Sequence, residues 1–479
     1  MLTTSKCSAL SVALPSEVFG ANVAGYNASL ASYWTTQEQA LHPACIVVPS
    51  SSSDISRAVK ILSHVRCEFA VKSGGHTPFA GAANINKGIT IDLSKLNSTT
   101  ISADRTTALV GPGARWGGVY STLQALGFTI PGGRDASVGV GGLVIGGGIS
   151  FYSPRVGLVC DAVINFEVVL ASGAIVNANA TSNRRLFRAL KGGSNNFGIV
   201  TRIDTPLIKT DAIWGGFLYT DESLRPTANS FFAKFADSKT YDPYASHFQS
   251  HALVNGSWLL ILHMAYTEPG ANNPAVFQPL LKLPGQSTVR QATHFNLTEE
   301  LTAGTPSNVR VVWITMTYKN DESFMETFVQ MGNETLSPLR DIEGLFLALN
   351  FQPLSQIIIQ NAAKNGGDAL GLDAEDGDLV VINLGVFWGS SADDARIYNT
   401  VWKLFEDGKQ KAKEMGVWNE YLYLNYGLRH ENYTQDVITS YGQASQSMLK
   451  SVSKQYDPTG IFQNDVPGGF KLFPLITLQ

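Results

Sequence analysis

Residues 131–150 read PGGRDASVGVGGLVIGGGIS, and eight of these twenty residues are glycine. Glycine lets a ligand or a second backbone segment approach closely, and it allows positive φ angles. Consecutive exposed backbone N–H groups form a concavity that suits an anion such as a pyrophosphate. The stretch therefore predicts a cofactor cradle, and the competing interpretation is a glycine-rich buried turn.

Two shorter glycine-rich segments flank this run in the sequence. KSGGH, residues 72–76, ends a stretch (EFAVKSGGH) that is otherwise typical of a buried strand, and KGGSNNFGIVT, residues 191–201, precedes another strand. Three such segments in one half of the chain indicate one large ligand with an extended polar spine. His76 then either bonds to that ligand or is an ordinary polar loop residue.

Common nucleotide and metal motifs do not explain these segments. Gly139 and Gly141 fit the pattern G-x-G-x-x-G, but Val144 stands in the place of the third glycine and no clear strand precedes the motif. A Rossmann domain is therefore disfavoured, and a P-loop is excluded because no G-x-x-x-x-G-K-[ST] occurs. His247 and His251 have a spacing that would suit metal ligands on a helix, but SHFQSHALV, residues 246–254, predicts a strand, so we expect no metal.

Composition limits the partners and the compartment. The length of 479 residues favours two domains. A net charge of −4 and the lack of any apolar run of roughly 20 residues argue against nucleic-acid and membrane partners. The four cysteines (Cys7, Cys45, Cys67 and Cys160) match no zinc pattern, and their disulfide pairing is left open. Seven N-x-S/T sequons occur, at Asn27, Asn97, Asn179, Asn255, Asn296, Asn333 and Asn432.

The sequons favour a secreted glycoprotein in which a disulfide or two is plausible. The first residues, MLTTSKCSAL, lack the charged and apolar regions of a signal peptide, so a cytoplasmic protein is the alternative. We expect a monomer.

Hydrophobic patterning predicts an α+β fold. Residues 41–210 alternate short strands with helices, among them a helix within residues 49–62, a helix within 115–127 that stops at Gly127, and a hairpin turning at Ser172-Gly173. Residues 211–420 predict an antiparallel sheet covered by helices, with a turn at Asn255-Gly256. YLYLNYG, residues 421–427, predicts a strand that puts Tyr421, Tyr423 and Asn425 on one face.

Four segments together resemble a known family. KSGGH, SVGVGGLVIGGG (137–148), VCDAVINFEVVLASG (159–173) and KGGSNNFGIVT are similar to the FAD-binding (PCMH-type) domain of the vanillyl-alcohol oxidase superfamily, and within it to the fungal berberine-bridge-enzyme-like oxidases. YLYLNYG and YDPTGIFQ (456–463) resemble the closing elements of that family. The resemblance implies a two-part FAD-binding domain at 1–207 with its core at about 41–207, a substrate domain at 208–420, and a segment at 421–479 that returns to the FAD-binding domain.

The resemblance also assigns cofactor residues. His76 matches the histidine that bonds covalently to the 8α-methyl group of the flavin. Many relatives add a second link through a cysteine, but Asp135 stands at that position here, so we expect FAD with a single link. Val138 matches a position that faces the reactive centre, where a small side chain favours access of O2. The full expected cofactor set is Lys72, Ser73, Gly74, Gly75, His76, Thr77, Gly81, Val138, Gly139, Gly141, Gly142, Gly146, Gly147, Gly148, Gly198, Ile199, Val200, Asn425 and Tyr426.

For catalysis, the family pattern Y-x-N-Y maps to Tyr423, Asn425 and Tyr426. We expect Tyr423 or Tyr421 to take the hydroxyl proton of the substrate, with Gln352 as a polar group of the pocket; the alternative for the tyrosines is an aromatic face that packs against a core. The expected reaction moves hydride from a substrate C–H to flavin N5, with an alcohol, a sugar or a secondary-metabolite hydroxyl as substrate and O2 reoxidation giving H2O2. The alternatives are an oxidative cyclase and a flavin-binding protein without turnover.

Overall fold

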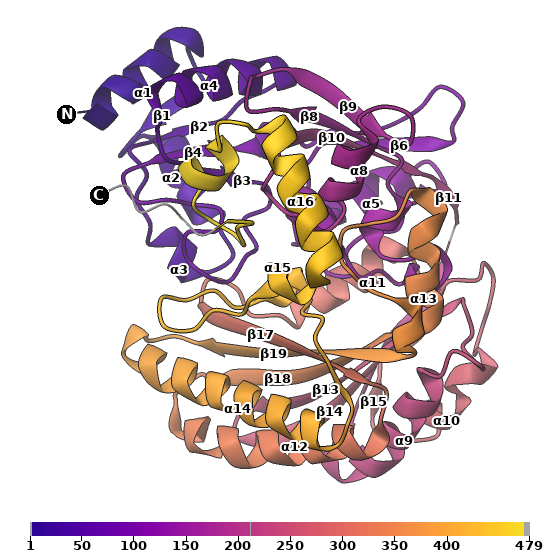
Figure 1. The fold of residues 1–479 in the computed structure, drawn as a ribbon. Helices are drawn as coiled ribbons and strands as arrows, with labels where there is room; N and C mark the ends of the chain where they lie inside the picture. The colour runs from indigo at the N-terminus through magenta and orange to yellow at the C-terminus, as the bar shows by residue number, and fades with distance from the viewer. Residues whose placement is uncertain (1, 211, 474–479) are drawn as a thin grey trace.

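Two groups of sheets face each other in the molecule (Figure 1). The computed structural model describes residues 2–210 and 212–473. The N-terminal half forms small sheets with helices around them, and residues from 213 onward form one large antiparallel sheet with helices beneath it. The prediction of an α+β fold with an antiparallel sheet covered by helices is confirmed.

The N-terminal half contains three sheets. The first has the order β1-β2-β4-β3, in which β2 and β3 run parallel to β4. The second has the order β5-β6-β10-β8-β9 and is antiparallel, and β7 pairs with β11 in the third. Their bounds are β1 Val18–Gly20, β2 Cys45–Val47, β3 Phe69–Lys72, β4 Ile89–Asp92, β5 Thr99–Ile101, β6 Thr107–Val110, β7 Phe128–Thr129, β8 Asn165–Val169, β9 Ile175–Asn179, β10 Ile199–Pro206 and β11 Ile208–Lys209.

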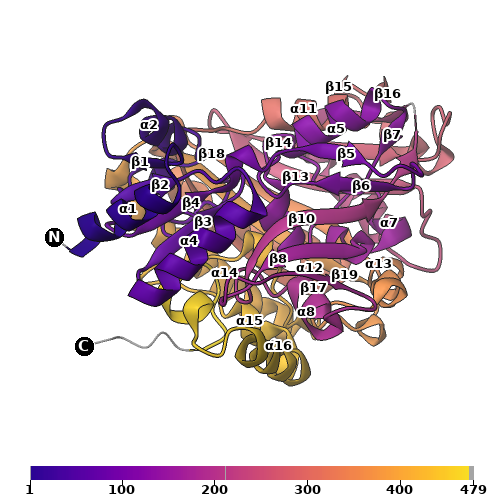
Figure 2. The ribbon, with the colours of Figure 1, turned by 90° about the horizontal axis from the view of Figure 1, so that it is seen from above.

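Helix α4 shows how the sequence pattern builds this half. Helix α4 lies beside the first sheet (Figure 2). Ser51 caps the helix by accepting a hydrogen bond from the backbone N–H of Asp54, and the side chains of Ile55, Val59 and Leu62 are fully buried against the sheet. The predicted helix at 49–62 is thus confirmed. The helices of this half are α1 Leu2–Ala13, α2 Ala24–Ala31, α3 Thr36–Gln39, α4 Ser52–Val65, α5 Trp116–Gln124, α6 Val140–Ile145, α7 Ser153–Val156 and α8 Arg184–Leu190. Helix α5 ends at Gln124, three residues before the predicted stop at Gly127.

The large sheet has the order β15-β12-β14-β13-β18-β19-β17-β20, with β16 also paired to β12. The predicted turn at Asn255-Gly256 joins β13 to β14. Helices α9, α12 and α14 cover one face of the sheet (Figure 1). Bounds are β12 Ile213–Asp221, β13 Ala245–Val254, β14 Ser257–Tyr266, β15 Gln286–Ser287, β16 Arg290–Ala292, β17 Arg310–Lys319, β18 Phe346–Leu354, β19 Leu379–Trp388, β20 Trp418–Asn419, α9 Arg225–Phe235, α10 Gln278–Leu281, α11 His294–Ala303, α12 Glu322–Leu336, α13 Gln356–Asn361 and α14 Asp394–Glu414.

The chain then returns to the N-terminal half. Helices α15 (Val437–Ser440) and α16 (Gly442–Tyr456) follow, and α16 packs on α8 (Figures 1 and 2). The predicted strand at 421–427 is wrong, because Leu424–Tyr426 form a 3-10 turn. Polar side chains hold this segment on the glycine-rich loop instead: Asn425 donates to the carbonyl of Leu143, and the Tyr423 hydroxyl accepts from the N–H of Gly148.

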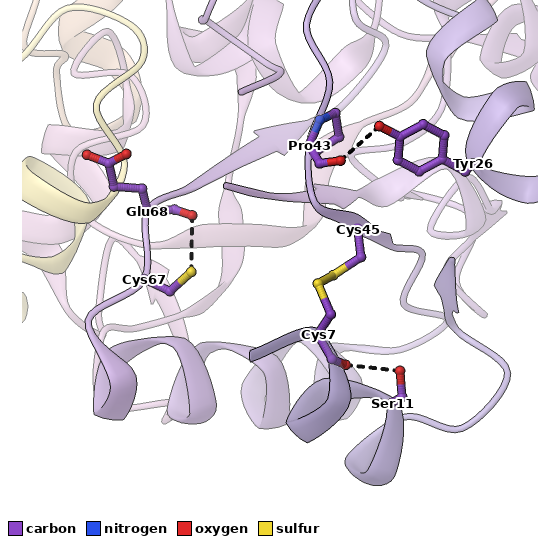
Figure 3. Close-up of a disulfide and its surroundings, with 7 residues drawn as sticks. All are labelled: Cys7, Ser11, Tyr26, Pro43, Cys45, Cys67 and Glu68. Carbon is purple, nitrogen blue, oxygen red and sulfur yellow. Dashed lines mark hydrogen bonds between the residues drawn. A yellow bond between two sulfur atoms is a disulfide. The ribbon is translucent and has the colours of Figure 1, made fainter. Parts of the chain in front are cut away.

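One disulfide ties the N-terminal helix to the first sheet. Cys7 of α1 is bonded to Cys45 of β2 (Figure 3). Cys67 and Cys160 are free and buried. The sequence left this pairing open because spacing alone does not determine connectivity.

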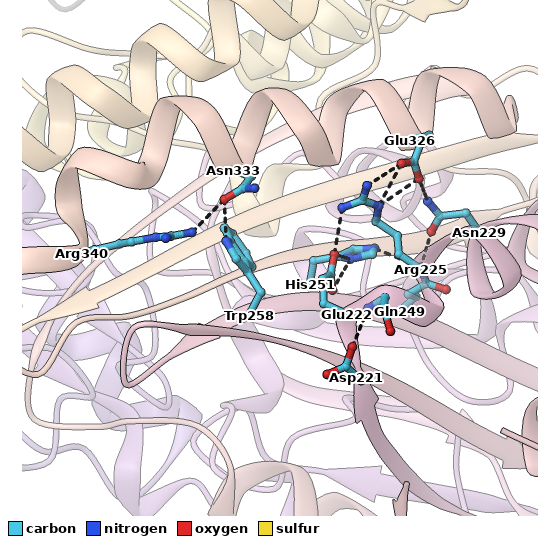
Figure 4. A network of polar contacts seen from close by, with 11 residues as sticks. Asp221, Glu222, Arg225, Asn229, Gln249, His251, Trp258, Glu326, Asn333 and Arg340 are labelled. Carbon is cyan, nitrogen blue, oxygen red and sulfur yellow. Dashed lines mark hydrogen bonds and ion pairs between the residues drawn. The ribbon is translucent and has the colours of Figure 1, made fainter. Parts of the chain in front are cut away.

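A polar network lies between the large sheet and its helices (Figure 4). His251 on β13 contacts the carboxylate of Glu222, and Arg225 pairs with Glu326 on α12. The predicted strand at 246–254 is confirmed, and His247 is engaged elsewhere, with its Nδ1 at 2.7 Å from the carbonyl oxygen of His263. Within residues 2–210 and 212–473, no group of His, Cys, Asp or Glu side chains is placed to hold a metal, and no helix is long and apolar enough to cross a membrane.

Candidate cofactor and substrate site

A cavity of about 440 Å³ lies between the N-terminal sheets and the large sheet. This volume is within the range of about 300–1,000 Å³ that is usual for small-molecule sites. Glycine-rich segments line one end of the cavity, and strands β12, β13, β17, β18 and β19 line the other.

The glycines form a cradle in which two backbone segments touch. A Cβ atom at Gly74 would lie 2.4 Å from the Cα of Gly139, which is closer than real Cβ contacts allow. Ser73 supports the contact, since its hydroxyl donates to the carbonyl of Pro112 at 2.5 Å and accepts from the N–H of Gly141 at 3.2 Å. Bare backbone at this place suits the pyrophosphate and ring system of FAD, because N–H groups can reach the ligand without side chains between.

Most of the expected cofactor and catalytic residues line this cavity. They are Ser73, Gly74, Gly75, His76, Thr77, Val138, Gly139, Gly141, Gly142, Gly198, Ile199, Val200, Gln352, Tyr423, Asn425 and Tyr426. The structure therefore brings together residues from five separate segments of the sequence.

Six expected residues lie outside the lining: Lys72, Gly81, Gly146, Gly147, Gly148 and Tyr421. The Lys72 ammonium is buried and pairs with Asp92 at 2.9 Å, so it supports the strand that leads into the cradle. Gly148 lies outside the cavity, but its backbone N–H donates a hydrogen bond to the hydroxyl of Tyr423, which lines it. Tyr421 is fully buried, and burial raises the pKa of its phenol well above the usual value.

His76 lies at the junction of the cradle and the large sheet. Its ring stacks on Trp34 with centroids 4.0 Å apart, and its Nε2 lies 3.1 Å from the hydroxyl of Ser137. Desolvation lowers the pKa of His76 to about 4, although the Asp135 carboxylate opposes this shift. The imidazole is therefore neutral at pH 7, which is the form in which a ring nitrogen can act as a nucleophile.

The large sheet presents every second side chain to the cavity. On β18 these are Phe346, Ala348, Asn350 and Gln352, and on β19 they are Asn383, Gly385 and Phe387. The alternate residues of the same strands face the covering helices, as the period of two in a strand requires. Phe217, Tyr219, Phe248, Ile261 and Trp313 complete a largely apolar wall.

Three polar side chains meet within this wall. The Tyr426 hydroxyl donates to Gln352 Oε1 at 3.2 Å, and Arg134 Nη2 donates to the same oxygen and, at 3.3 Å, to the Tyr426 oxygen. Among the described residues, Arg134 has no carboxylate partner, and its Nε and Nη1 make no hydrogen bond. The Arg134 charge also lies over the Phe248 ring, 5.1 Å from the centroid.

Tyr423 has a different environment. Its oxygen accepts hydrogen bonds from the Gly148 N–H and the Asn425 amide, both at 3.0 Å. Burial is the main cause that raises the pKa of Tyr423 above its usual value. Tyr423 therefore keeps its own proton and can donate it into the cavity.

Sequence reasoning missed Arg134 and Trp34. Arg134 stands inside the glycine-rich run, where the family resemblance assigns a role only to its neighbour Asp135, as the residue in place of cysteine. No local pattern marks either residue, because their partners lie far away in the sequence: Gln352 is 218 positions from Arg134.

Comparisons with known proteins identify relatives that bind FAD. The FAD binding domain family matches residues 43–179. The FAD-dependent monooxygenase sdcF of Emericella nidulans is 38% identical over 475 residues, which cover 97% of this chain and 98% of that protein. The structure of glucooligosaccharide oxidase from Acremonium strictum, a protein with a 6-S-cysteinyl, 8α-N1-histidyl FAD, matches with a TM-score of 0.80 at 19% identity, covering 98% of this chain and 99% of that one. The structure of 6-hydroxy-D-nicotine oxidase from Arthrobacter nicotinovorans matches with a TM-score of 0.76 at 20% identity, covering 96% and 98%.

Fold and site together define an enzyme that binds FAD and transfers electrons. The chain belongs to the family of FAD-dependent oxidoreductases that includes sdcF. Its fold is that of the vanillyl-alcohol oxidase (PCMH-type), berberine-bridge-enzyme-like oxidases. This membership confirms the resemblance drawn from the four sequence motifs.

Proposed function

We propose that the protein is an FAD-dependent oxidase that removes hydride from a carbon bearing a hydroxyl group. The observation that carries this proposal is one continuous cavity that joins the glycine cradle to the Tyr426–Gln352–Arg134 group. Bound FAD supplies an acceptor for hydride at N5, and O2 then takes the two electrons to give H2O2.

The residues of the chain handle the hydroxyl proton. Tyr426 accepts it in the phenolate form, which the Arg134 guanidinium stabilises through its hydrogen bond to the Tyr426 oxygen at the cavity wall. The guanidinium cannot give up its own proton at neutral pH and stabilises the negative charge that develops on oxygen. Tyr423, whose proton is free to donate, orients the substrate oxygen. This assignment moves the expected role from Tyr423 and Tyr421 to Tyr426.

The substrate we propose is an aromatic or conjugated alcohol rather than an oligosaccharide. The walls carry Phe217, Phe248, Trp313 and Phe346, which bury flat apolar rings, and Arg134 offers unused donors to an acidic oxygen. Sugars are recognised by many neutral hydrogen-bonding groups, which this wall supplies mainly through Asn350, Gln352 and Asn383.

Oxygen labelling separates this proposal from its rivals. With a panel of aromatic alcohols, the oxidase releases one H2O2 for each product and no 18O from 18O2 enters the product. Label in the product would support the monooxygenase activity named for the Emericella relative, and a ring-closed product without label would support an oxidative cyclase. A bound flavin that no member of the panel reduces would favour a binding protein without turnover.

We further propose that FAD is held by a single covalent link through His76. Support comes from the neutral imidazole beside the cradle and from Asp135 at the place where doubly linked relatives have cysteine. After acid precipitation, the flavin absorbance of the wild type should stay with the pellet. His76→Ala should bind flavin that moves to the supernatant, and flavin that stays with the His76→Ala pellet would refute the link.

We also propose that the protein is a secreted, glycosylated monomer whose domain boundaries lie at residues 207 and 420. The Cys7–Cys45 disulfide is typical of an oxidising compartment, and Asn27, Asn97, Asn255, Asn296 and Asn432 are exposed sequons. A mobility shift after enzymatic deglycosylation of the protein from its native host would support it, whereas an unshifted protein recovered from the cytoplasm would contradict it.

A further inference from the structure

Asp135, Ser137 and His76 form a hydrogen-bonded chain beside the cradle. Asp135 Oδ1 accepts from the Ser137 hydroxyl at 2.6 Å and from the Ser137 N–H at 2.8 Å. The same oxygen accepts from the hydroxyl of Thr302 on α11 at 2.8 Å, so the position of the carboxylate is set from both halves of the molecule. Ser137 Oγ lies 3.1 Å from His76 Nε2.

The number of available protons determines which group donates in each of these hydrogen bonds. A carboxylate has no proton to donate, so the single hydroxyl proton of Ser137 points to Asp135. The Ser137 oxygen must then accept from His76, which places the one N–H of the neutral imidazole on Nε2. In the neutral ring, Nδ1 consequently carries the lone pair.

We infer that Asp135 and Ser137 are positioning residues for flavin attachment: they hold His76 in the tautomer whose Nδ1 is the nucleophile and take the Nε2 proton as the bond forms. This inference rests on the proposed link through His76. Attachment forms a bond from Nδ1 to the 8α carbon, breaks one C–H bond of that carbon and removes the Nε2 proton through Ser137 to Asp135. The two electrons pass to the flavin ring system and then to O2, so that two protons and two electrons end in H2O2.

The charged surroundings agree with this role. Arg115 is the other charged group near His76; it lowers the pKa of the imidazole while Asp135 raises it. The Arg115 guanidinium donates to the Gly74 and Ser32 carbonyls and forms no ion pair with Asp135 among the described residues. The hydrogen bonds of Asp135 Oδ1 are therefore with Ser137 and Thr302 rather than with Arg115. A position that carries a linking cysteine in many relatives here serves the histidine link.

The test follows covalent loading separately from cofactor binding. Apo-protein is mixed with FAD, and the fraction of flavin that survives denaturation is measured over time by in-gel fluorescence and intact mass, while quenching of free FAD fluorescence reports non-covalent binding. We expect Asp135→Asn and Ser137→Ala to slow covalent loading by roughly 10- to 100-fold, the effect of removing one hydrogen bond to a charged group, and to leave non-covalent binding intact.

Two variants separate a positioning role from a structural one. Ser137→Thr keeps the hydroxyl and should restore loading, and Asp341→Asn, an exposed member of the Arg396 ion pair, makes the same charge change far from the cavity and should load as the wild type. If the wild type carries no covalent flavin, the proposed link itself fails and the inference fails with it. If the wild type loads covalently and Asp135→Asn and Ser137→Ala load equally fast, the inference is overturned while the link stands. Loss of non-covalent binding in both variants would also overturn it, since they would then act on the fold.

Discussion

The Cys7–Cys45 disulfide should stabilise the protein by an amount that can be calculated from the length of the loop it closes. The bond closes a loop with a sequence separation of 38 residues. The loop-entropy relation gives a change of about 13 cal/mol/K for that length, which is about 4 kcal/mol at 25 °C. Cys7→Ser is the appropriate variant because Cys7 is half-buried, whereas serine at the fully buried Cys45 would add the cost of burying a hydroxyl.

The assay is urea unfolding of the wild type and of Cys7→Ser, each with and without dithiothreitol. We expect the variant and the reduced wild type to lose about 4 kcal/mol of unfolding free energy, and dithiothreitol to have no further effect on the variant. Thiol titration in denaturant should count two thiols without reductant and four after reduction, since Cys67 and Cys160 are free. Four thiols without reductant, or equal unfolding midpoints for wild type and variant, would refute the reasoning.

Three further predictions concern the cradle, the buried histidines and the proposed base. Gly74→Ala should separate the two touching backbones, destabilise the protein by about 1–3 kcal/mol in thermal unfolding and lower its flavin content. Gly118→Ala, on an open face of α5, is the control and should stabilise the protein by about 1 kcal/mol. A Gly74→Ala protein with full flavin content would contradict the role of this backbone contact in binding FAD. Burial lowers the pKa of His247 to about 4, below the value of about 6.5 in the unfolded chain, so the unfolded state binds the proton first as the pH falls. Stability should decrease by about 3 kcal/mol between pH 6.5 and 4 on account of this residue, and urea unfolding of His247→Gln should show a flatter acid limb; equal slopes would be inconsistent with a buried neutral imidazole. Tyr426→Phe should slow flavin reduction in stopped flow by about 100-fold or more, whereas Tyr421→Phe, outside the cavity, should stay within about twofold; the reverse order would return the base to Tyr421.

Local patterns were sufficient to predict much of the fold and the cofactor end of the site. The hairpin at β13 and β14 follows from alternation on either side of Asn255-Gly256, and α4 follows from its cap and apolar spacing. Likewise, the glycine-rich segments could be predicted to lie at a close backbone contact, because a contact such as that between Gly74 and Gly139 leaves no room for a side chain.

Where a residue's partners lie in distant parts of the chain, local sequence patterns could not predict its conformation or its role. YLYLNYG alternates like a strand, but Asn425 and Tyr423 bond to the loop around Leu143 and Gly148 and hold the segment out of the sheet. Lys72 belongs to a cofactor motif, yet its side chain turns to Asp92 on the neighbouring strand. The role of Arg134 depends on Gln352 and Tyr426, which no nearby pattern reveals.

The returning C-terminal segment has a consequence for biosynthesis. Tyr423, Asn425, Tyr426, Phe462 and Phe470 all line the cavity, so the walls come from both ends of the chain as well as its middle. These residues leave the ribosome well after the glycine cradle has emerged. A nascent chain that stops before residue 421 therefore presents the cradle open to water on one side. The segment from residue 421 to Phe470 is consequently part of the cavity wall, and deleting it removes part of the site rather than a dispensable tail.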